Sequence, residues 1–370
     1  MTKANPGLEG VVVADTAVSD VDGERGHLVI AGADVEELAR TASFEEATAR
    51  VLAAGAGTPV AAAPLAERLG RARAEAWELL PRIGDALDHA DGMDALRTAL
   101  AHLRPGPVWG GGGGAPDLDG DTDAALRAIG AGPVLVAAWS RRRAGRAPVA
   151  PDPALGHAAD YLRMTTGQAP TPAAATAMNA YLVTVIDHAM SASTFTARVI
   201  ASTGSDLLSA AVGAIGALKG PLHGGAPGPV LDMLDAIGRP EDAERWLLAE
   251  LAAGRRIMGM GHRVYRVRDP RAAVLEEAAR PLSSDRLALA RAVETAASKI
   301  LRERKPDRPL AANVEFYTAV LLDAVGLPRE QFSPTFAISR LAGWSAHVLE
   351  QRRTGRLIRP ASHYTGPRPA

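Results

Sequence analysis

Hydrophobic and polar positions follow two patterns along the 370-residue chain. Near its start, residues 11–14 (Val-Val-Val-Ala) and His27–Ile30 are short β-prone runs, and Asp22-Gly23 between them is a turn signal, so we predict a small hairpin. From Val35 onward the pattern becomes helical and stays so. The sequence therefore predicts an all-α protein with a short N-terminal β element.

Capping and stop signals mark several helix ends. Ser43-Phe-Glu-Glu46 resembles a capped helix start. Thr171-Pro172 places a cap before a proline at the first helical position, and Gly220-Pro221 is a strong stop signal. Ala- and Leu-rich helical segments run to about residue 104, and later helices are expected over residues 134–143, 155–166, 171–190, 205–219, 240–253, 270–279, 285–304, 314–325 and 336–353.

Residues 105–123 include five consecutive glycines, Gly110 to Gly114. Because ordering such a run carries a high entropy cost, we predict a flexible surface loop or an insertion here. A phosphate-binding loop is disfavoured, since no Gly-Lys-Ser/Thr follows the glycines and no clear strand precedes them.

Composition narrows the functional classes. Hydrophobic residues form 47% of the chain, enough for more than one domain or for one large core with a smaller lobe. The net charge of −1 and an aromatic content of 4% argue against a nucleic-acid partner. The chain has no cysteine, which excludes disulfides and thiolate chemistry.

Targeting and membrane signals are weak. The N-terminus lacks the apolar run of a signal peptide, and the longest apolar stretch, Leu207–Leu218, is shorter than the ~20 residues that a membrane-spanning helix needs. We therefore expect a soluble cytoplasmic protein without a membrane partner.

Residues 257–271 place one imidazole, that of His262, in an arginine-rich segment. The segment contains Arg263, Arg266, Arg268 and Arg271, and Arg256 immediately precedes it. This combination suits an anionic organic substrate that needs a proton donor and carboxylate clamps. Residues 255–308 hold 14 Lys and Arg against 7 Asp and Glu, a net charge of +7. A polyphosphate or polycarboxylate ligand would explain this imbalance, and so would a solvated basic helix face.

Two further residues are candidates for catalysis. His223 follows a helix end and precedes two glycines, where its ring can donate a hydrogen bond to a substrate carbonyl, although a loop histidine is more often structural. Glu315 interrupts an apolar run, where burial would raise its pKa and make it a usable base. An ordinary surface glutamate is the alternative.

Six motifs occur along the chain in a recognisable order. They are Asp187-His188 with Ser193-Thr-Phe-Thr-Ala-Arg198, Gly220-Pro-Leu-His-Gly-Gly-Ala226, Gly259-Met-Gly-His-Arg-Val-Tyr265 with Asp269-Pro-Arg271, Asn313-Val-Glu-Phe-Tyr317, Arg340-Leu-Ala-Gly-Trp-Ser-Ala-His347, and Arg359-Pro360. In order and spacing they resemble the citrate synthase family, over essentially the full length from residue 7 to residue 366.

The resemblance implies a homodimer of all-α subunits, with a large domain of residues 1–224 and 333–370, a small domain of residues 225–332, and the active site between them. Such an enzyme would condense acetyl-CoA with oxaloacetate and water to give citrate and CoA through an enol or enolate, as in the tricarboxylic acid cycle. This acyltransferase would use the CoA thioester as a substrate, with no separate cofactor and no metal.

The resemblance also implies a role for each matched residue. His223 would donate a hydrogen bond to the thioester oxygen, Glu315 would remove the α-proton, and His262 would polarise and protonate the ketone. Oxaloacetate would be held by His188, Arg271, Arg340 and, from the partner subunit, Arg359. Arg266 and Asn313 would contact CoA.

The chain departs from the family pattern at several positions. Glu315 stands where aspartate is usual, so its carboxylate must retract by about a bond length or its backbone must lie farther away. Met260 replaces a usual Phe or Tyr, Pro227 stands where Asn is common, and residues 30–34 lack a Tyr-Arg-Gly-Tyr pattern. Without the extra N-terminal domain of the hexameric, NADH-inhibited type, we expect the shorter dimeric type.

Other functions remain open at this point. A 2-methylcitrate synthase would use propionyl-CoA on the same scaffold, and one methyl group in an apolar pocket is worth only ~1–3 kcal/mol of discrimination. Glu315 also raises the alternative of a catalytically silent protein that keeps the scaffold for binding or regulation. A nucleic-acid binder is suggested only by the basic segment and is disfavoured by the near-neutral chain.

Overall fold

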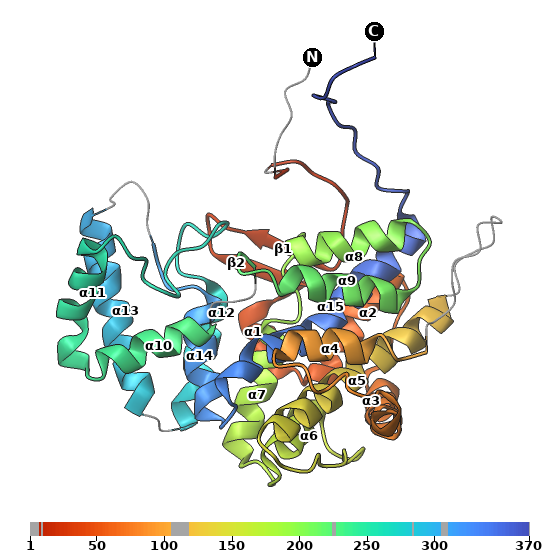
Figure 1. Ribbon diagram of the computed structural model, residues 1–370, viewed down its shortest axis with the longest axis horizontal. Helices are drawn as coiled ribbons and strands as arrows, with labels where there is room; N and C mark the ends of the chain where they lie inside the picture. The colour runs from red at the N-terminus through yellow and green to blue at the C-terminus, as the bar shows by residue number, and fades with distance from the viewer. Residues whose placement is uncertain are drawn as a thin grey trace.

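The computed structural model of the protein describes residues 7–8, 10–104, 118–223, 227–282, 285–304 and 310–369. Helices dominate these residues, and the strands form one small antiparallel sheet (Figure 1). The α-helices are α1 (Val35–Thr41), α2 (Phe44–Ala56), α3 (Ala62–Leu79), α4 (Gly92–Leu100), α5 (Leu118–Arg143), α6 (His157–Thr166), α7 (Pro172–Thr184), α8 (Ala192–Ser202), α9 (Leu207–Leu218), α10 (Pro227–Ile237), α11 (Ala243–Ala252), α12 (Pro270–Ala279), α13 (Asp285–Arg304), α14 (Val314–Ala324) and α15 (Phe332–Thr354). The predicted all-α fold with a short N-terminal β element is confirmed.

The N-terminal sheet contains β1 (Ser19–Asp22), β2 (His27–Ile30) and β3 (Ala33–Asp34) in that order. The Asp22 side chain accepts hydrogen bonds from the backbone N–H groups of Glu24 and Arg25. These bonds close the turn, and Asp22 pairs with His27 across it. The prediction of a strand at residues 11–14 is wrong. If the pairing of β1 with β2 continued toward the N-terminus, residues 11–14 would lie opposite α1, which is a helix. They therefore have no strand with which to pair.

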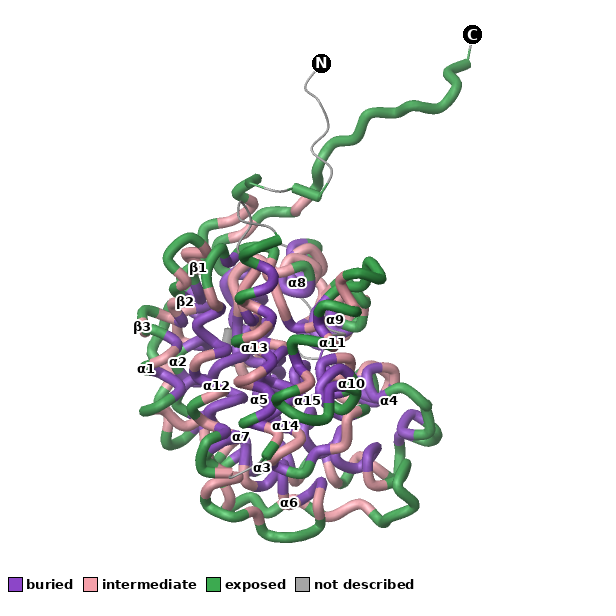
Figure 2. Tube along the Cα trace, turned by 90° about the vertical axis from the view of Figure 1, so that its left-hand side faces the viewer, coloured by how far each residue is buried: buried purple, intermediate pink, exposed green. Residues whose placement is uncertain are grey.

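Helix α15 is the centre of the larger group of helices. It packs against α2, α5, α8 and α9, and nearly all of its side chains are buried, as the purple tube in Figure 2 shows. This helix is buried although it carries polar side chains such as Arg340, His347 and Glu350, and each of these is hydrogen-bonded inside the protein. It begins four residues before the predicted start at residue 336, because Pro334 lies in the first turn, where a proline is tolerated.

A second group of helices lies to the left in Figure 1. Helices α10, α13 and α14 contact one another, and α11 packs against α13. Helix α12 joins this group to the larger one, since it packs against α14 on one side and against α7 and α1 on the other. The segment that precedes α12 and the turn that follows α7 therefore meet at the junction of the two groups.

Four helix predictions need correction, one of which is that α10, at Pro227–Ile237, was not predicted. The helix expected over residues 171–190 ends at Thr184, and residues 185–191 form a turn before α8, which was not predicted. Residues 118–123 were expected in the glycine-rich loop but begin α5, because buried alanines such as Ala124 and Ala128 pack this helix against α3. Gly110 to Gly114 lie outside the described residues.

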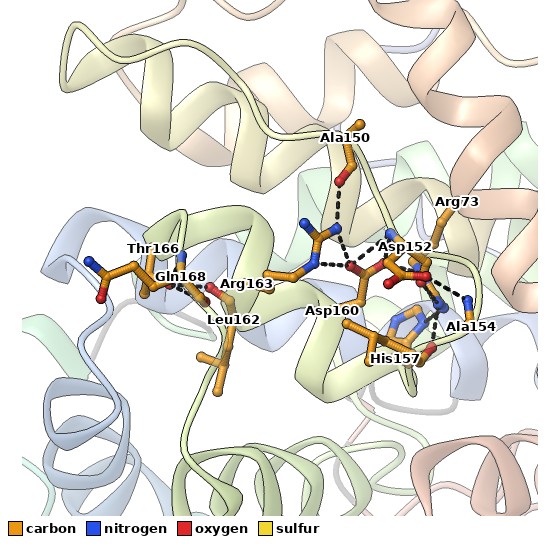
Figure 3. A network of polar contacts seen from close by, with 11 residues as sticks. Arg73, Ala150, Asp152, Ala154, His157, Asp160, Leu162, Arg163, Thr166 and Gln168 are labelled. Carbon is orange, nitrogen blue, oxygen red and sulfur yellow. Dashed lines mark hydrogen bonds and ion pairs between the residues drawn. The ribbon is translucent and has the colours of Figure 1, made fainter.

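A buried ion-pair network fixes the connection between α5 and α6 (Figure 3). The Arg73 Nε of α3 donates to the Asp160 Oδ2 of α6 at 2.8 Å, and the two side chains are 1% and 0% exposed. Asp160 also accepts hydrogen bonds from Arg163 and from the backbone N–H of Asp152, and Arg73 donates to the carbonyl of Leu155. Every polar atom of the Asp160 carboxylate is thereby satisfied, as a buried charge requires.

Candidate active site

The turn after α7 carries His188. Arg340 holds this turn, because its buried Nε donates to the carbonyl of Val185 at 2.6 Å. Ala189, the next residue, has a φ of +47°, a left-handed conformation that is unfavourable for a residue with a Cβ atom. Burial, followed by the charges of Arg271 and Arg340, lowers the pKa of His188 well below its usual value. His188 is therefore a neutral imidazole.

The segment before α12 brings His262 to the same place. The rings of His188 and His262 lie edge to face with centroids 5.6 Å apart, and Tyr265 contacts both. The His262 Nδ1 accepts the backbone N–H groups of Val264 and Tyr265 at 3.0 and 3.1 Å, so the ring proton is on Nε2. Burial and then the charge of Arg271 lower the pKa of His262 to about 4. His262 is thus a neutral donor with its tautomer fixed.

Two glycines join the His262 segment to the start of α14. Gly259 and Gly261 have φ values of +72° and +89°, and a Cβ atom on either would lie within 3 Å of a neighbouring side chain. The Gly261 N–H donates to the carbonyl of Ala311 at 2.7 Å, and the Asn313 N–H donates to the carbonyl of Gly259 at 2.9 Å. Only glycine allows this close pairing, which places His262 beside the helix end that carries Glu315.

Asn313 and Asp269 fix the positions of Glu315 and Arg271. The Asn313 side chain caps α14 by accepting the Glu315 N–H, and its amide donates to the carbonyl of Gly261. Asp269 accepts the Val314 N–H and forms a bidentate pair with the Arg271 guanidinium at 3.0 and 2.8 Å. Arg271 is only 3% exposed in its side chain, so it presents a fixed positive charge next to the histidines.

Glu315 is the acidic group of the cluster. Its Oε2 is buried and has no hydrogen-bond partner among the described residues. Burial raises the pKa of Glu315 to about 7, although the nearby charges of Arg271 and Arg340 lower it. A carboxylate that titrates near neutral pH is matched to the work of a general base.

His223, in the segment that follows α9, is the third histidine of the cluster. Its Nε2 lies 2.8 Å from the Ser193 Oγ and accepts the Ser193 N–H at 3.3 Å, which leaves the proton on Nδ1. Ser193 in turn accepts a hydrogen bond from the Trp344 Nε1 at 3.2 Å. Burial and the charge of Arg340 lower the pKa of His223 to about 4, so this ring too is neutral.

The structure brings together most of the predicted site residues. The charge of Arg271 lowers the pKa of His188, His262 and Glu315, and the charge of Arg340 lowers that of His188, His223 and Glu315, so the two arginines lie within reach of the other four groups. Arg266 is about half exposed at the edge of the His262 segment. Arg359 is exposed and lies on a separate cavity of about 800 Å³ between the N- and C-terminal segments. The contacts described for Arg359 do not include the histidine cluster.

Sequence reasoning missed three residues that hold this site. Tyr265 contacts both histidines, Asp269 orients Arg271, and Ser193 orients His223. Each lies within a quoted motif, but spacing in the sequence does not show which side chain faces another segment.

Among the described residues, no helix combines the length and apolar character that crossing a bilayer requires, and no three His, Asp or Glu side chains gather in a group that could hold a metal ion.

Comparison with known proteins identifies the family. Residues 7–361 match the family described as citrate synthase, C-terminal domain. A Mycobacterium tuberculosis protein named putative citrate synthase 2 is 40% identical over 371 residues, which cover 98% of this chain and 93% of that protein. A 2-methylcitrate synthase of the same species is 36% identical over 373 residues, which cover 97% and 90%.

A solved structure agrees with these relatives. The citrate synthase of Thermoplasma acidophilum, in a ternary complex with carboxymethyl coenzyme A and oxaloacetate, has a TM-score of 0.86 and 28% sequence identity, covering 100% of this chain and 98% of its own. The chain therefore belongs to the citrate synthase family.

Proposed function

We propose that this protein condenses acetyl-CoA with oxaloacetate and water to give citrate and CoA. One observation carries the proposal: a buried carboxylate with a pKa of about 7 lies in a cluster of neutral histidines and fixed arginines. The solved relative binds carboxymethyl coenzyme A and oxaloacetate, a thioester analogue and a ketodiacid. The cluster has the chemistry that both ligands require.

The first step is removal of a proton from the methyl group of the thioester. A carbon acid of this kind is very weak, so the enolate oxygen needs a positioned donor. Glu315 removes the proton, and the Nδ1–H of His223 donates a hydrogen bond to the thioester oxygen. The bond from Ser193 to Nε2 fixes the His223 tautomer for this task.

The second step is attack of the enol or enolate carbon on the ketone of oxaloacetate. His262 carries its proton on Nε2. This N–H donates a hydrogen bond that polarises the ketone, and it protonates the new alkoxide as the carbon–carbon bond forms. Arg271, Arg340 and His188 bind the two carboxylates and the carbonyl. Water then hydrolyses the citryl thioester and releases CoA.

The CoA contacts are proposed for Arg266 and Asn313. Arg266 is exposed, and its guanidinium is 3.9 Å from its nearest acidic partner, Glu24, so it is available to a phosphate. Asn313 already donates its backbone N–H to Gly259 and uses one Nδ2–H and one lone pair of Oδ1 within the protein, so the second Nδ2–H is the donor that it can offer to the coenzyme. No separate cofactor is needed, since the thioester is itself a substrate.

We further propose a cytoplasmic homodimer in which Arg359 binds oxaloacetate in the partner subunit's site. The C-terminal segment after α15 extends away from the body (Figure 1), and Arg359 lies on the cavity between this segment and the N-terminal residues. The proposed domains are residues 1–224 with 333–370, and residues 225–332. Closure of one on the other would exclude water and strengthen the hydrogen bonds to the enolate.

A second candidate is 2-methylcitrate synthesis from propionyl-CoA, which the 36% identical relative of that name favours. Release of CoA thiol from each acyl-CoA in the presence of oxaloacetate separates the two. A higher kcat/KM for acetyl-CoA supports the first proposal, and a strong preference for propionyl-CoA supports the second. No thiol release from either acyl-CoA would contradict both.

A further inference from the structure

The N-terminal hairpin touches two of the segments that form the site. In the view of Figure 1 the hairpin of β1 and β2 is drawn between α8 and α11, and in Figure 2 it lies toward one edge of the molecule. Its open end, at Ser19, contacts the turn that carries His188, and its closed end, at Gly23, contacts the segment that carries His262. None of the six sequence motifs includes this hairpin.

At the open end, one hydroxyl holds both sides of the His188 turn. The Ser19 side chain is buried, and its Oγ donates to the Asp187 Oδ2 at 2.5 Å while it accepts the Ala189 N–H at 2.8 Å. The bridged residues immediately precede and follow His188. Because the left-handed backbone of Ala189 is unfavourable by itself, the turn depends on such external hydrogen bonds.

A buried network holds the same carboxylate oxygen of Asp187 that Ser19 contacts. The His347 Nε2 lies 3.2 Å from the Asp187 Oδ2, and its Nδ1 accepts the Arg198 Nη1–H at 3.0 Å. Arg198 also donates to Glu350 at 2.6 Å. All four side chains are at most 3% exposed, and they belong to the α7 turn, α8 and α15. Ser19 therefore connects the hairpin to a rigid part of the core.

At the closed end, glycines let the hairpin approach the His262 segment. The Arg266 N–H donates to the carbonyl of Gly23 at 2.9 Å. A Cβ atom on Gly23 would lie 2.4 Å from the carbonyl oxygen of Val264, whose own N–H holds the His262 ring. Any larger residue at position 23 would therefore push the two backbones apart.

We propose that this hairpin sets the separation of His188 and His262, with Ser19 and Gly23 as positioning residues. A ketodiacid bound by both imidazoles and by Arg271 needs that separation to be fixed within a fraction of an ångström. The hairpin contacts both segments directly and spans the junction at which they meet. The inference rests on the proposed function for its substrate, but the effect on the two rings is measurable without turnover.

The kinetic test compares Ser19→Ala, Ser19→Thr and Gly23→Ala with Asp20→Asn, an exposed change on the same strand. Ser19→Ala removes both hydrogen bonds, so the KM for oxaloacetate should rise roughly tenfold while the KM for acetyl-CoA stays unchanged. Ser19→Thr keeps the hydroxyl and should restore the KM. Gly23→Ala should raise the same KM, and Asp20→Asn should not. Melting temperatures show that each variant is folded.

The structural test follows the imidazole ¹H and ¹⁵N resonances of the full-length protein, assigned from His188→Gln and His262→Gln. Ser19→Ala should shift the His188 signals, Gly23→Ala should shift those of His262, and Asp20→Asn should shift neither. Unchanged ring signals and an unchanged KM in both variants would overturn the inference. If the wild type releases no thiol, the proposed function fails, and the ring signals alone decide whether the hairpin positions the histidines.

Discussion

The His188 Nε2 lies 3.1 Å from the hydroxyl of Tyr265, so one polar contact joins the turn after α7 to the segment before α12. Tyr265 also donates its backbone N–H to the His262 Nδ1, and its ring centroid lies 5.8 Å from the Arg271 guanidinium carbon. Tyr265 therefore touches three of the side chains that we propose to hold oxaloacetate.

Removal of the Tyr265 hydroxyl should weaken substrate binding without disturbing the fold. Tyr265→Phe keeps the ring contacts to His262 and Arg271 but loses the contact to His188, so kcat/KM for oxaloacetate should fall roughly three- to tenfold. Tyr364→Phe, on the exposed C-terminal segment, is the matched control and should behave as wild type. Equal kinetics for the two variants would show that the contact to His188 has no part in binding.

The pH dependence of kcat/KM should report the ionisation of Glu315. A general base acts only in its ionised form, and burial raises the pKa of Glu315 to about 7. Activity should therefore rise with pH and level off above about 7. The histidines contribute no limb in this range, because the pKa values of His223 and His262 lie at about 4. An acid limb near pH 4.5, the usual value for a glutamate, would contradict the proposed burial of this group.

Much of the fold could be predicted from local signals, because those signals act within a few residues. The Ser43 capping box forms with both of its hydrogen bonds, and α12 and α13 have the predicted bounds. The end of α7 could not be predicted in this way. It is set by Arg340 and Ser19, which come from distant parts of the chain. Their hydrogen bonds stabilise the His188 turn, so the helix does not continue past Thr184.

The site was predictable at the level of residue identity and not at the level of contacts. The family motifs pointed to His188, His262 and Glu315, and the charge of Arg271 acts on all three in the structure. Ser19 lies outside every motif, and the close approach at Gly23 depends on an opposing backbone. Such pairings carry no periodicity and become visible only once the segments are packed.

The network at Asp160 should contribute more to stability than a surface ion pair. Asp160→Asn leaves the buried guanidinium of Arg73 without its counter-charge, so the free energy of unfolding should fall by about 3–5 kcal/mol. Asp123→Asn breaks the exposed pair with Arg68, and it should lower that free energy by at most ~1 kcal/mol. Denaturant unfolding of both variants measures the difference. Similar losses in the two variants would contradict the proposed role of burial.

Subunit complementation tests the proposed location of Arg359. Glu315→Gln and Arg359→Ala should each inactivate the homodimer. Mixed dimers would contain one site with both native residues only if Arg359 acts in the partner subunit's site. Random pairing should then restore about a quarter of the wild-type activity. Inactive mixed dimers, shown by size and mass measurements to have formed, would place Arg359 outside the partner's site.

The most direct measurement is the rate of CoA thiol release by Glu315→Gln, beside Glu315→Asp and the exposed control Glu330→Gln. Glutamine keeps the shape of the side chain but cannot accept the proton, so the rate should fall by about 10²- to 10⁴-fold, whereas Glu315→Asp should keep part of it and Glu330→Gln all of it. The melting temperature of Glu315→Gln separates this loss from unfolding, and because burial disfavours the ionised carboxylate, the variant should be at least as stable as wild type above pH 7. Full turnover in Glu315→Gln would contradict the account, since the buried carboxylate would then not be the base.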